Sequence, residues 1–340
     1  RCYFMAKILK AKRNFNFYIE DFMEYCKLKG LSRKTMKSYE SSLLLFSKYI
    51  EEEYQLSKVE EIKLTHAKEY VKFTKERGKY SYVSDDKTVS INNPSIRRDF
   101  GKAVSPATIN NYIRNLKVFF TWAVDNKIIK YSPMDKVQFV KVKRKPKDSI
   151  SDADFTALIK SIDVTKYFEY RDYVIIQLIM DTGMRLGETL SLTIDDIDLD
   201  RRSVLIPADI TKSKKERYVF FSNTMAGILR RWLQFKDRYV DNDILIFPTT
   251  RGTKLGIQNF ERNFRIYKER AGLYQNVTPH SLRNNFAKRC LMSGMDIYTL
   301  SRILGHSSVT VTEKAYLDLT VTDIRKNYQK FSPLENMQKR

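Results

Sequence analysis

The first 140 residues place apolar side chains at intervals of three and four, with polar residues between them. This spacing puts the apolar positions on one face of an α-helix. The two clearest stripes consist of Met36, Tyr39, Leu43, Phe46 and Ile50, and of Ile109, Tyr112, Leu116, Phe119 and Ala123. Ser32 precedes the first stripe as an N-cap, and Ser105-Pro106 opens the second. The pattern predicts a small helical bundle.

Residues 74–104 interrupt this bundle with a polar stretch. Within it, Tyr80–Val83 and Thr88–Ile91 have strand-like composition and flank the polar residues 84–87, which predicts an inserted hairpin. Connections of this length are either functional or disordered.

A basic segment containing a proline, residues 141–148, follows the bundle and reads as a linker. After it, helical patterns at 154–160 and 170–181 are followed by a β-rich stretch at 203–221 and then by further helices. The expected fold class is mainly α with a small β-sheet (α+β). The expected divisions are an N-terminal segment (1–13), a helical domain (14–140), the linker (141–148), a second domain (149–319) and a tail (320–340).

The charge balance narrows the class of partner. The chain of 340 residues carries 62 Lys and Arg against 40 Asp and Glu, a formal net charge of +22. Such an excess favours a long polyanion such as nucleic acid, although anionic membranes also attract basic chains. No apolar run approaches the roughly 18 residues that span a bilayer, and no signal peptide opens the chain. We therefore expect no membrane association and a cytoplasmic location.

Neither the cysteines nor the acidic pairs indicate a metal or another cofactor. Cys2, Cys26 and Cys290 are far apart and lack the spacing of a zinc site. The pair Asp195-Asp196 falls between a helix and a strand, where carboxylates usually cap the turn. We expect no cofactor.

Two separate clusters carry residues that suit a phosphodiester. In the later one, His280 and Arg283 lie one helical turn apart, and His306 and Tyr316 follow. Guanidinium and imidazole donors stabilise charge on non-bridging oxygens, and a phenol needs such a site to act as a nucleophile. In the earlier one, an apolar helix ends at Gly183 and another opens at once with Arg185 on its first turn, where main-chain amides and a guanidinium favour an anion.

Between the clusters, the strand-like runs 204–206 and 218–221 flank a lysine-rich turn. This arrangement predicts a hairpin with Lys212, Lys214 and Lys215 near its tip.

These three motifs, in this order, resemble the tyrosine recombinases, the integrases and Xer-like enzymes of phages, plasmids and mobile elements. The resemblance runs from Ser151 to Leu319, with a weaker match before it. It implies a helical core-binding domain followed by a catalytic domain. The catalytic residues that it implies are Arg185, Lys212, His280, Arg283, His306 and Tyr316, with Glu188 in support.

The resemblance also implies a mechanism. Tyr316 attacks the scissile phosphate and forms a 3′-phosphotyrosyl link. Arg185, Arg283 and His306 hold the non-bridging oxygens, Lys212 protonates the departing 5′-oxygen, and His280 takes or shares the phenol proton. Site-specific recombination then proceeds through a Holliday junction, with integration, excision, transposition and dimer resolution all left open.

The implied partners are double-stranded DNA recombination sites and further copies of the chain, as a dimer and as a tetramer in synapsis, with an accessory directionality factor as a further candidate. Residues expected to meet DNA are Arg33, Lys34, Lys37, Asn110, Asn111, Arg114 and Lys117 between the apolar stripes, and Lys143, Arg144 and Lys145 in the linker. Two alternatives stay open: a type IB topoisomerase-like enzyme, and a catalytically silent DNA-binding regulator.

Overall fold

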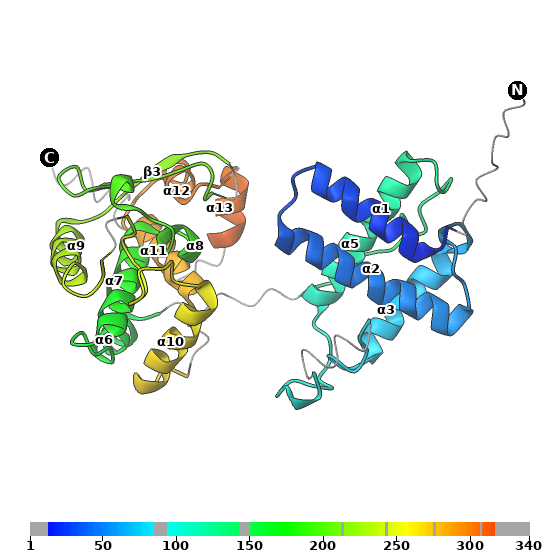
Figure 1. The fold of residues 1–340 in the computed structure, drawn as a ribbon, viewed down its shortest axis with the longest axis horizontal. Coiled ribbons are helices and arrows are strands. Elements are labelled where there is room, and N and C mark those ends of the chain that lie inside the picture. Colours follow the sequence, from blue (N-terminus) through cyan, green and yellow to red (C-terminus); the bar gives the residue numbers. More distant parts are fainter. Residues whose placement is uncertain are drawn as a thin grey trace, which may run out of the picture. The chain divides into compact units, whose positions relative to one another are not determined.

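The chain forms two compact units, Arg1–Arg144 and Lys145–Arg340, in a computed structural model (Figure 1). The division falls inside the basic segment 141–148. The structure describes residues 13–84, 94–142, 150–211, 214–241, 244–274, 277–306 and 308–316.

The first unit is a bundle of helices. Its described helices are α1 (Phe15–Leu28), α2 (Arg33–Tyr54), α3 (Leu64–Glu76) and α5 (Pro106–Asp125), with 3-10 turns η1 (Val59–Glu61) and η2 (Pro94–Ile96). The predicted caps are confirmed: the hydroxyls of Ser32 and Ser105 accept the amides of Thr35 and Thr108. Because both apolar stripes face inward, α2 and α5 pack together around an aromatic core.

A buried polar contact fixes the pairing of α2 with α5. The side-chain nitrogen of Asn115, which is 3% exposed, lies 3.0 Å from the Ser38 carbonyl oxygen and 2.9 Å from the Ser42 hydroxyl. Buried polar groups are stable only when paired, so this contact favours one register of the two helices.

The hairpin predicted within residues 74–104 is wrong for its first strand. Tyr80–Val83 forms no strand; its described neighbourhood holds only an isolated bridge between Gly78 and Ala103. Tyr82 instead packs edge-on against Phe73, and its hydroxyl donates to Glu52 at 2.7 Å. Packing on α2 and α3 thus replaces strand pairing. The expected second strand, Thr88–Ile91, lies outside the described residues.

The second unit consists of helices with a small sheet at one edge (Figure 1). The strands β1 (Ile197–Asp198), β2 (Ser203–Ile206) and β3 (Arg217–Phe220) are antiparallel in the order β1-β2-β3. The helices are α6 (Asp152–Lys160), α7 (Tyr167–Thr182), α8 (Leu186–Thr189), α9 (Asn223–Lys236), α10 (Ile257–Arg270), α11 (Pro279–Met292), α12 (Ile297–Leu304) and α13 (Val309–Tyr316), with a 3-10 turn η3 (Ile194–Asp196). The predicted α+β class and the hairpin of β2 and β3 are confirmed.

Helix α7 is the centre of this unit, because it packs against α9, α10 and α11. Its apolar residues between 174 and 179 are fully buried. A buried ion pair within α7 also binds α10: Arg171 Nη2 lies 2.9 Å from Asp172 Oδ1, while Asp172 Oδ2 accepts from Asn263 and Tyr267 of α10. Since each oxygen of the carboxylate is bonded, the pair holds α10 in place.

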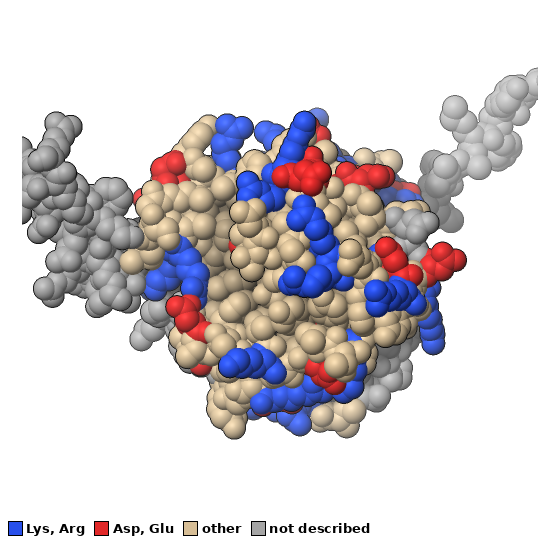
Figure 2. All heavy atoms as spheres, turned by 90° about the vertical axis from the view of Figure 1, so that its left-hand side faces the viewer, with Lys and Arg blue, Asp and Glu red and all other residues tan. Residues whose placement is uncertain are grey.

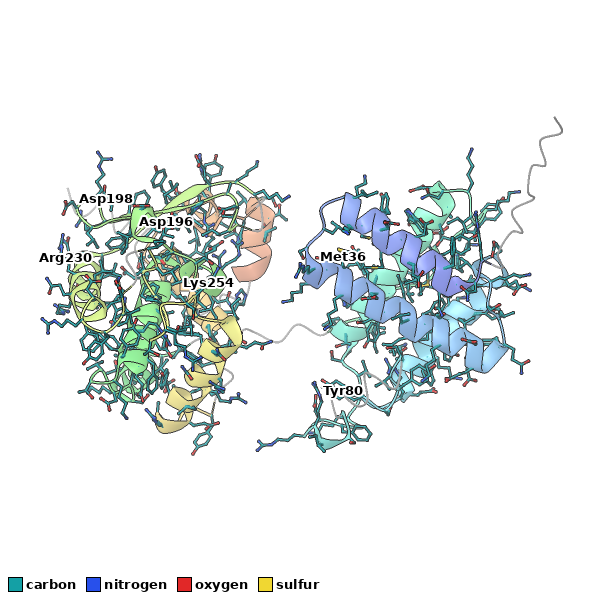
Figure 3. The ribbon with its side chains drawn as sticks, viewed as in Figure 1. Met36, Tyr80, Asp196, Asp198, Arg230 and Lys254 are labelled. Atoms are coloured by element: carbon teal, nitrogen blue, oxygen red, sulfur yellow. The ribbon has the colours of Figure 1, made fainter. Side chains whose placement is uncertain are left out.

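Of the acidic pair Asp195-Asp196, Asp196 caps the turn before the sheet, as predicted. The Asp196 carboxylate accepts from the amide and hydroxyl of Thr193 at 2.7 and 2.8 Å, and Asp198 accepts from the amides of the turn that follows it (Figure 3). Among the described residues no group of His, Cys, Asp or Glu has a metal-binding arrangement. No helix within the described ranges is both long and apolar enough to cross a membrane.

Candidate active site

A sharp turn between α7 and α8 positions Arg185, the arginine of the earlier sequence cluster. Helix α7 ends at Gly183, whose φ of 68° is left-handed, and Arg185 then caps α8. A Cβ at Gly183 would lie 2.3 Å from the Phe286 ring of α11, so only glycine allows this close approach. The turn therefore fixes the position of Arg185 at the start of α8.

Glu188 ties Arg185 to the sheet. Its carboxylate, 2% exposed, lies 2.8 Å from Arg185 Nη1 and accepts the Arg185 amide at 2.9 Å. From β3, Arg217 contributes a second ion pair at 2.6 Å. Burial on its own raises the pKa of Glu188, but the hydrogen bonds and charge of Arg217, together with those of Arg185, outweigh it and lower the pKa below its ordinary value.

Arg283, from α11, is 3% exposed and bridges two turns of chain. Its Nη1 donates to the Gly183 carbonyl at 2.7 Å, and its Nη2 donates to the Leu304 carbonyl at 2.7 Å. Arg185 Nη2 reaches the next carbonyl, Gly305, at 3.4 Å. Both guanidinium groups thus meet consecutive carbonyls at the end of α12.

His306 follows these carbonyls directly. Its Nε2 lies 3.2 Å from Arg283 Nη2, and its Nδ1 lies 2.7 Å from the hydroxyl of Thr312, which is fully buried on α13. A guanidinium group can only donate, so Nε2 accepts and Nδ1 carries the proton in this arrangement. Thr312 therefore fixes the tautomer of the imidazole.

Three other predicted catalytic residues are less fully described. Tyr316 is the last residue of α13, a helix that contacts both α11 and α12, and its side chain is outside the described atoms. His280 is exposed on the first turn of α11. Lys212 lies outside the described residues, as do the linker residues Lys143, Arg144 and Lys145.

A pocket of about 850 Å³ opens beside this cluster, between β3 and α12. His306, Gly305 and Arg217 line it together with Lys215 and Arg302. Its walls thus combine the site with further basic side chains, which suits an anionic ligand.

The predicted DNA-facing residues of the first unit differ in their surroundings. Arg33, Lys34, Lys37 and Arg114 are exposed. Asn110, expected to be exposed, is half-buried: its Nδ2 donates to the Val140 carbonyl at 2.8 Å, and its Oδ1 accepts the Val140 amide at 2.7 Å. Its amide holds the segment after α5 rather than facing outward.

Asn111 and Lys117 are also half-buried. Asn111 donates to the Ser38 hydroxyl at 3.2 Å, and Lys117 to the Asp135 carbonyl at 3.4 Å.

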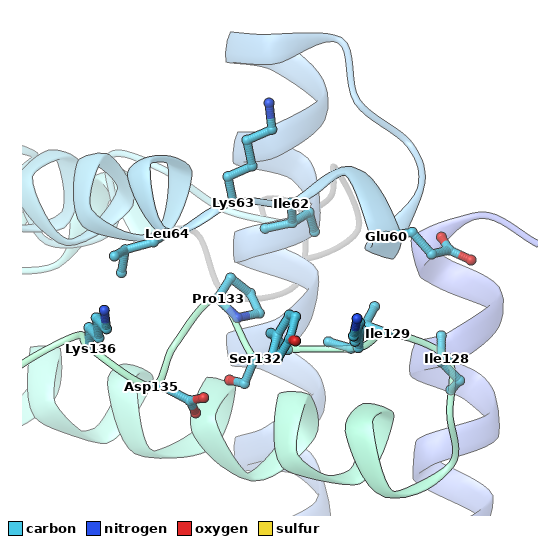
Figure 4. A pocket seen from close by; sticks show the side chains of 12 residues that line it. Glu60, Ile62, Lys63, Leu64, Ile128, Ile129, Ser132, Pro133, Asp135 and Lys136 are labelled. Carbon is cyan, nitrogen blue, oxygen red and sulfur yellow. The ribbon is translucent and has the colours of Figure 1, made fainter.

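A second pocket, about 740 Å³, lies in the first unit between residues 60–64 and 128–136 (Figure 4). Lys63 and Lys136 line it beside apolar residues such as Ile62 and Ile129. It holds no arginine and no histidine, so it lacks the donors that the other pocket gathers.

On the face of the second unit in Figure 2, basic and acidic side chains are interspersed. For example, Arg230, whose side chain is 51% exposed, forms an ion pair with Asp200. Another basic residue of this unit, Lys254, lies well away from Arg230 (Figure 3). What distinguishes Arg185, Arg283 and His306 is that they converge at the end of α12.

Two residues of the cluster, Arg217 and Thr312, were not predicted from the sequence. Arg217 alternates with the buried Val219 along β3, whereas Tyr218 and Phe220 are exposed. Side chains two apart on a strand share a face, so this period marks Arg217 as inward-facing. No sequence signal marks Thr312.

Comparisons with known proteins agree with this architecture. Residues 149–322 match the phage integrase family, and residues 19–91 match the phage integrase N-terminal SAM-like domain. Tyrosine recombinase XerD of Listeria monocytogenes is 24% identical over 324 residues, covering 94% of this chain and 99% of the relative. Tyrosine recombinase XerC of Thermodesulfovibrio yellowstonii is 26% identical over 328 residues, covering 94% and 98%.

Solved structures show the same fold. The Tn1549 transposon integrase in complex with transposon right end DNA has a TM-score of 0.70 at 19% identity, covering 93% of this chain and 99% of that chain. The XerH recombinase bound to palindromic difH substrate has a TM-score of 0.66 at 20% identity, covering 93% and 84%. Because the family match at 149–322 spans more than half of the 340 residues, the chain belongs to the phage integrase family, the tyrosine recombinases.

Proposed function

We propose that this chain is a site-specific DNA recombinase that cuts and rejoins DNA through a covalent bond to Tyr316. The observation that supports this best is the convergence of distant segments: Arg185 and Arg283 donate to the consecutive carbonyls of Gly305 and Leu304, next to His306. A helix that packs on α11 and α12 ends at Tyr316. The family names of the relatives agree with this chemistry.

In this mechanism, Arg185 and Arg283 bind the non-bridging oxygens of the scissile phosphate. Their planar groups suit a phosphate, and donors fixed before the reaction stabilise the charge that develops in the transition state. His306 joins them through Nε2, which donates to a phosphate oxygen once it is protonated and accepts from Arg283 otherwise.

Tyr316 attacks the phosphorus, forming the tyrosyl ester as the bond to the 5′-oxygen breaks. We assign protonation of that oxygen to Lys212, because a flexible ammonium can follow a leaving group. His280 takes or shares the phenol proton. The ester keeps the energy of the broken bond, so a second 5′-hydroxyl reseals the strand without ATP.

The first unit supplies a second DNA contact in this proposal. Its exposed cations Arg33, Lys34 and Lys37 lie together on the first turn and a half of α2, and Arg114 lies on α5. Phosphate contacts of this kind position a duplex without reading its sequence.

Strand exchange requires two DNA sites and therefore several protomers. Solved relatives include a lambda integrase dimer bound to a core site. We propose dimers that pair into a tetramer on the DNA of a mobile element, in the cytoplasm where that DNA lies. An accessory directionality factor is a further candidate partner.

Covalent capture tests the proposal. The purified protein is incubated with end-labelled duplexes of randomised sequence that carry a single nick, so that the cut fragment diffuses away and the adduct accumulates. We expect an adduct that survives denaturation and maps to Tyr316. Tyr316→Phe should abolish it while duplex binding stays nearly unchanged. An equal adduct in this variant contradicts the assignment.

Two further DNA substrates, paired copies of the recovered site and supercoiled plasmid, separate the alternatives. A recombinase joins strands from two copies of a recovered site and yields Holliday junctions. Relaxation of supercoiled plasmid without sequence preference instead favours the topoisomerase-like reaction, and DNA binding with no adduct favours a silent regulator.

A further inference from the structure

Arg217 makes several contacts within the site, but the mechanism above gives it no role. It begins β3, directly after the hairpin, and its side chain is 9% exposed. Its Nε donates to the Ile303 carbonyl at 2.9 Å, and its Nη1 and Nη2 donate to the two oxygens of Glu188 at 3.1 and 2.6 Å. Each of its nitrogens is thus directed at a different atom of the site.

The Glu188 carboxylate is held between two arginines. One oxygen bonds Arg185 Nη1 at 2.8 Å, and the other bonds the Arg185 amide at 2.9 Å, while Arg217 binds both oxygens from the opposite element. A carboxylate bound bidentately by one guanidinium has little freedom to rotate. The direction in which Glu188 holds Arg185 therefore depends on Arg217.

The other end of the contact lies on α12. The Ile303 carbonyl that Arg217 binds is followed by the Leu304 carbonyl, bound by Arg283, and by the Gly305 carbonyl, bound by Arg185. A Cβ at Gly305 would lie 2.9 Å from Arg217 Cδ and Nε, so glycine lets this side chain cross beneath the turn. The three arginines thus fix the main chain of residues 303–305, and His306 is the next residue.

We propose that Arg217 is a positioning residue of the active site: by clamping the Glu188 carboxylate and the Ile303 carbonyl, it sets the orientation of Arg185 and the place of His306. This inference rests on the proposed function, since orientation of these groups matters only if they act on a phosphate. Arg217 itself does not touch DNA in this role.

The chemistry of the contact predicts how substitutions rank. Glutamine at 217 removes the charge and the fork, and lysine keeps the charge but cannot bind Glu188 and Ile303 together. Misplacement of a catalytic group by about 1 Å costs on the order of 10²-fold in rate. Arg217→Gln should therefore slow single-turnover cleavage by on the order of 10²-fold, and Arg217→Lys should slow it by less, with the affinity for duplex nearly unchanged in both.

Arg270→Gln is the matched control for stability. Arg270 also binds a buried carboxylate in the same unit, Glu169, at 2.8 Å with that group 1% exposed, and it contacts none of the residues of the active site. If Arg217 contributed only to folding, both glutamine variants would lose cleavage in proportion to their loss in melting temperature. We expect Arg270→Gln to cleave at nearly the wild-type rate.

Glu188→Gln, alone and with Arg217→Gln, identifies the route. If Arg217 acts through Glu188, the double variant should be only slightly slower than the slower single variant. If the two residues acted independently, the fold-reductions in cleavage rate of the two single variants would multiply in the double variant.

The pH profile supplies a readout that a structural role would not change. Glu188 faces Arg185 from α8 and Arg217 from β3, and both favour its ionised form. Without Arg217, burial raises the pKa of this carboxyl, so it becomes protonated as the pH falls and releases Arg185. The ratio of the Arg217→Gln cleavage rate to the wild-type rate should therefore decrease as the pH is lowered.

The measurement is single-turnover cleavage of the nicked duplex recovered by covalent capture, with melting temperatures and duplex affinities of each variant. Absence of an adduct with wild-type protein overturns the proposed function and this inference with it. If wild-type protein forms the adduct, any of three results overturns this inference alone. Arg217→Gln could cleave at the wild-type rate, or both glutamine variants could lose cleavage in proportion to their loss in melting temperature. The third such result is a ratio of the Arg217→Gln rate to the wild-type rate that stays constant across pH.

Discussion

The two arginines proposed to bind phosphate should respond differently to replacement by lysine. Arg283 is 3% exposed and donates to two main-chain carbonyls, at 2.7 Å each. Arg185 keeps 32% of its side chain exposed and pairs with Glu188. Both substitutions should reduce cleavage, but Arg283→Lys should weaken the fold more than Arg185→Lys does.

The size of the effect follows from these contacts. Hydrogen bonds to charged groups contribute about 1.5–3 kcal/mol each, and lysine at 283 can keep one of the two. Arg283→Lys should therefore lower the free energy of unfolding by about 2 kcal/mol, equivalent to about 4–8 °C in melting temperature for a unit of this size. Arg185→Lys keeps a charge near Glu188 at a partly exposed position and should cost about 1 kcal/mol or less.

The loss of cleavage should be similar for both. Removing one preorganised donor to a transition-state anion costs on the order of 10²–10³ in rate. The assay pairs thermal unfolding with single-turnover adduct formation on one nicked duplex. Two outcomes would contradict this reasoning: a melting temperature of Arg283→Lys equal to that of wild type, or a melting temperature of Arg185→Lys below that of Arg283→Lys. In either case, the hydrogen bonds of Arg283 to the Gly183 and Leu304 carbonyls do not hold these turns together.

Two further substitutions test the turns around the site. Gly183→Ala forces a side chain into a left-handed backbone and against the Phe286 ring, so it should cost about 2–4 kcal/mol, measured by urea denaturation; a variant as stable as wild type contradicts the turn geometry. Thr312→Val removes the acceptor of His306 Nδ1 with little change in volume, and it should slow cleavage more than it weakens duplex binding. An unchanged cleavage rate in that variant would show that the tautomer of His306 needs no partner on α13.

Much of the fold and of the site was predictable from the sequence, because helix caps and helix ends depend on residue types within a few positions of one another. Ser32 and Ser105 cap their helices as expected. The helix that begins at Thr278-Pro279 and the glycine before His306 likewise follow from local preferences, so Arg283 and His306 could be placed on their elements in advance. That Arg283 and His306 lie together in one site could only be expected through the family resemblance.

What the sequence missed depends on contacts between distant segments. Tyr80–Val83 has the composition of a strand, yet the half-buried Tyr82 packs on Phe73 of α3 and bonds Glu52 of α2 instead. Asn110 has the polarity of a surface residue, yet both polar atoms of its side chain bind Val140, 30 residues away. Neither partner is visible in a local window, so the pattern alone gave the wrong surroundings.

The position of Glu188 explains how a site rich in arginine is stable before DNA arrives. Arg185 and Arg217 both approach one carboxylate, whose pKa they hold low, while Arg283 is satisfied by main-chain carbonyls. Like charges brought together in a partly buried site repel, and one fixed anion offsets part of that cost. The carboxylate is shared by two cations, so an excess of positive charge remains for a phosphate. The same group thus stabilises the empty site and leaves it complementary to its proposed substrate.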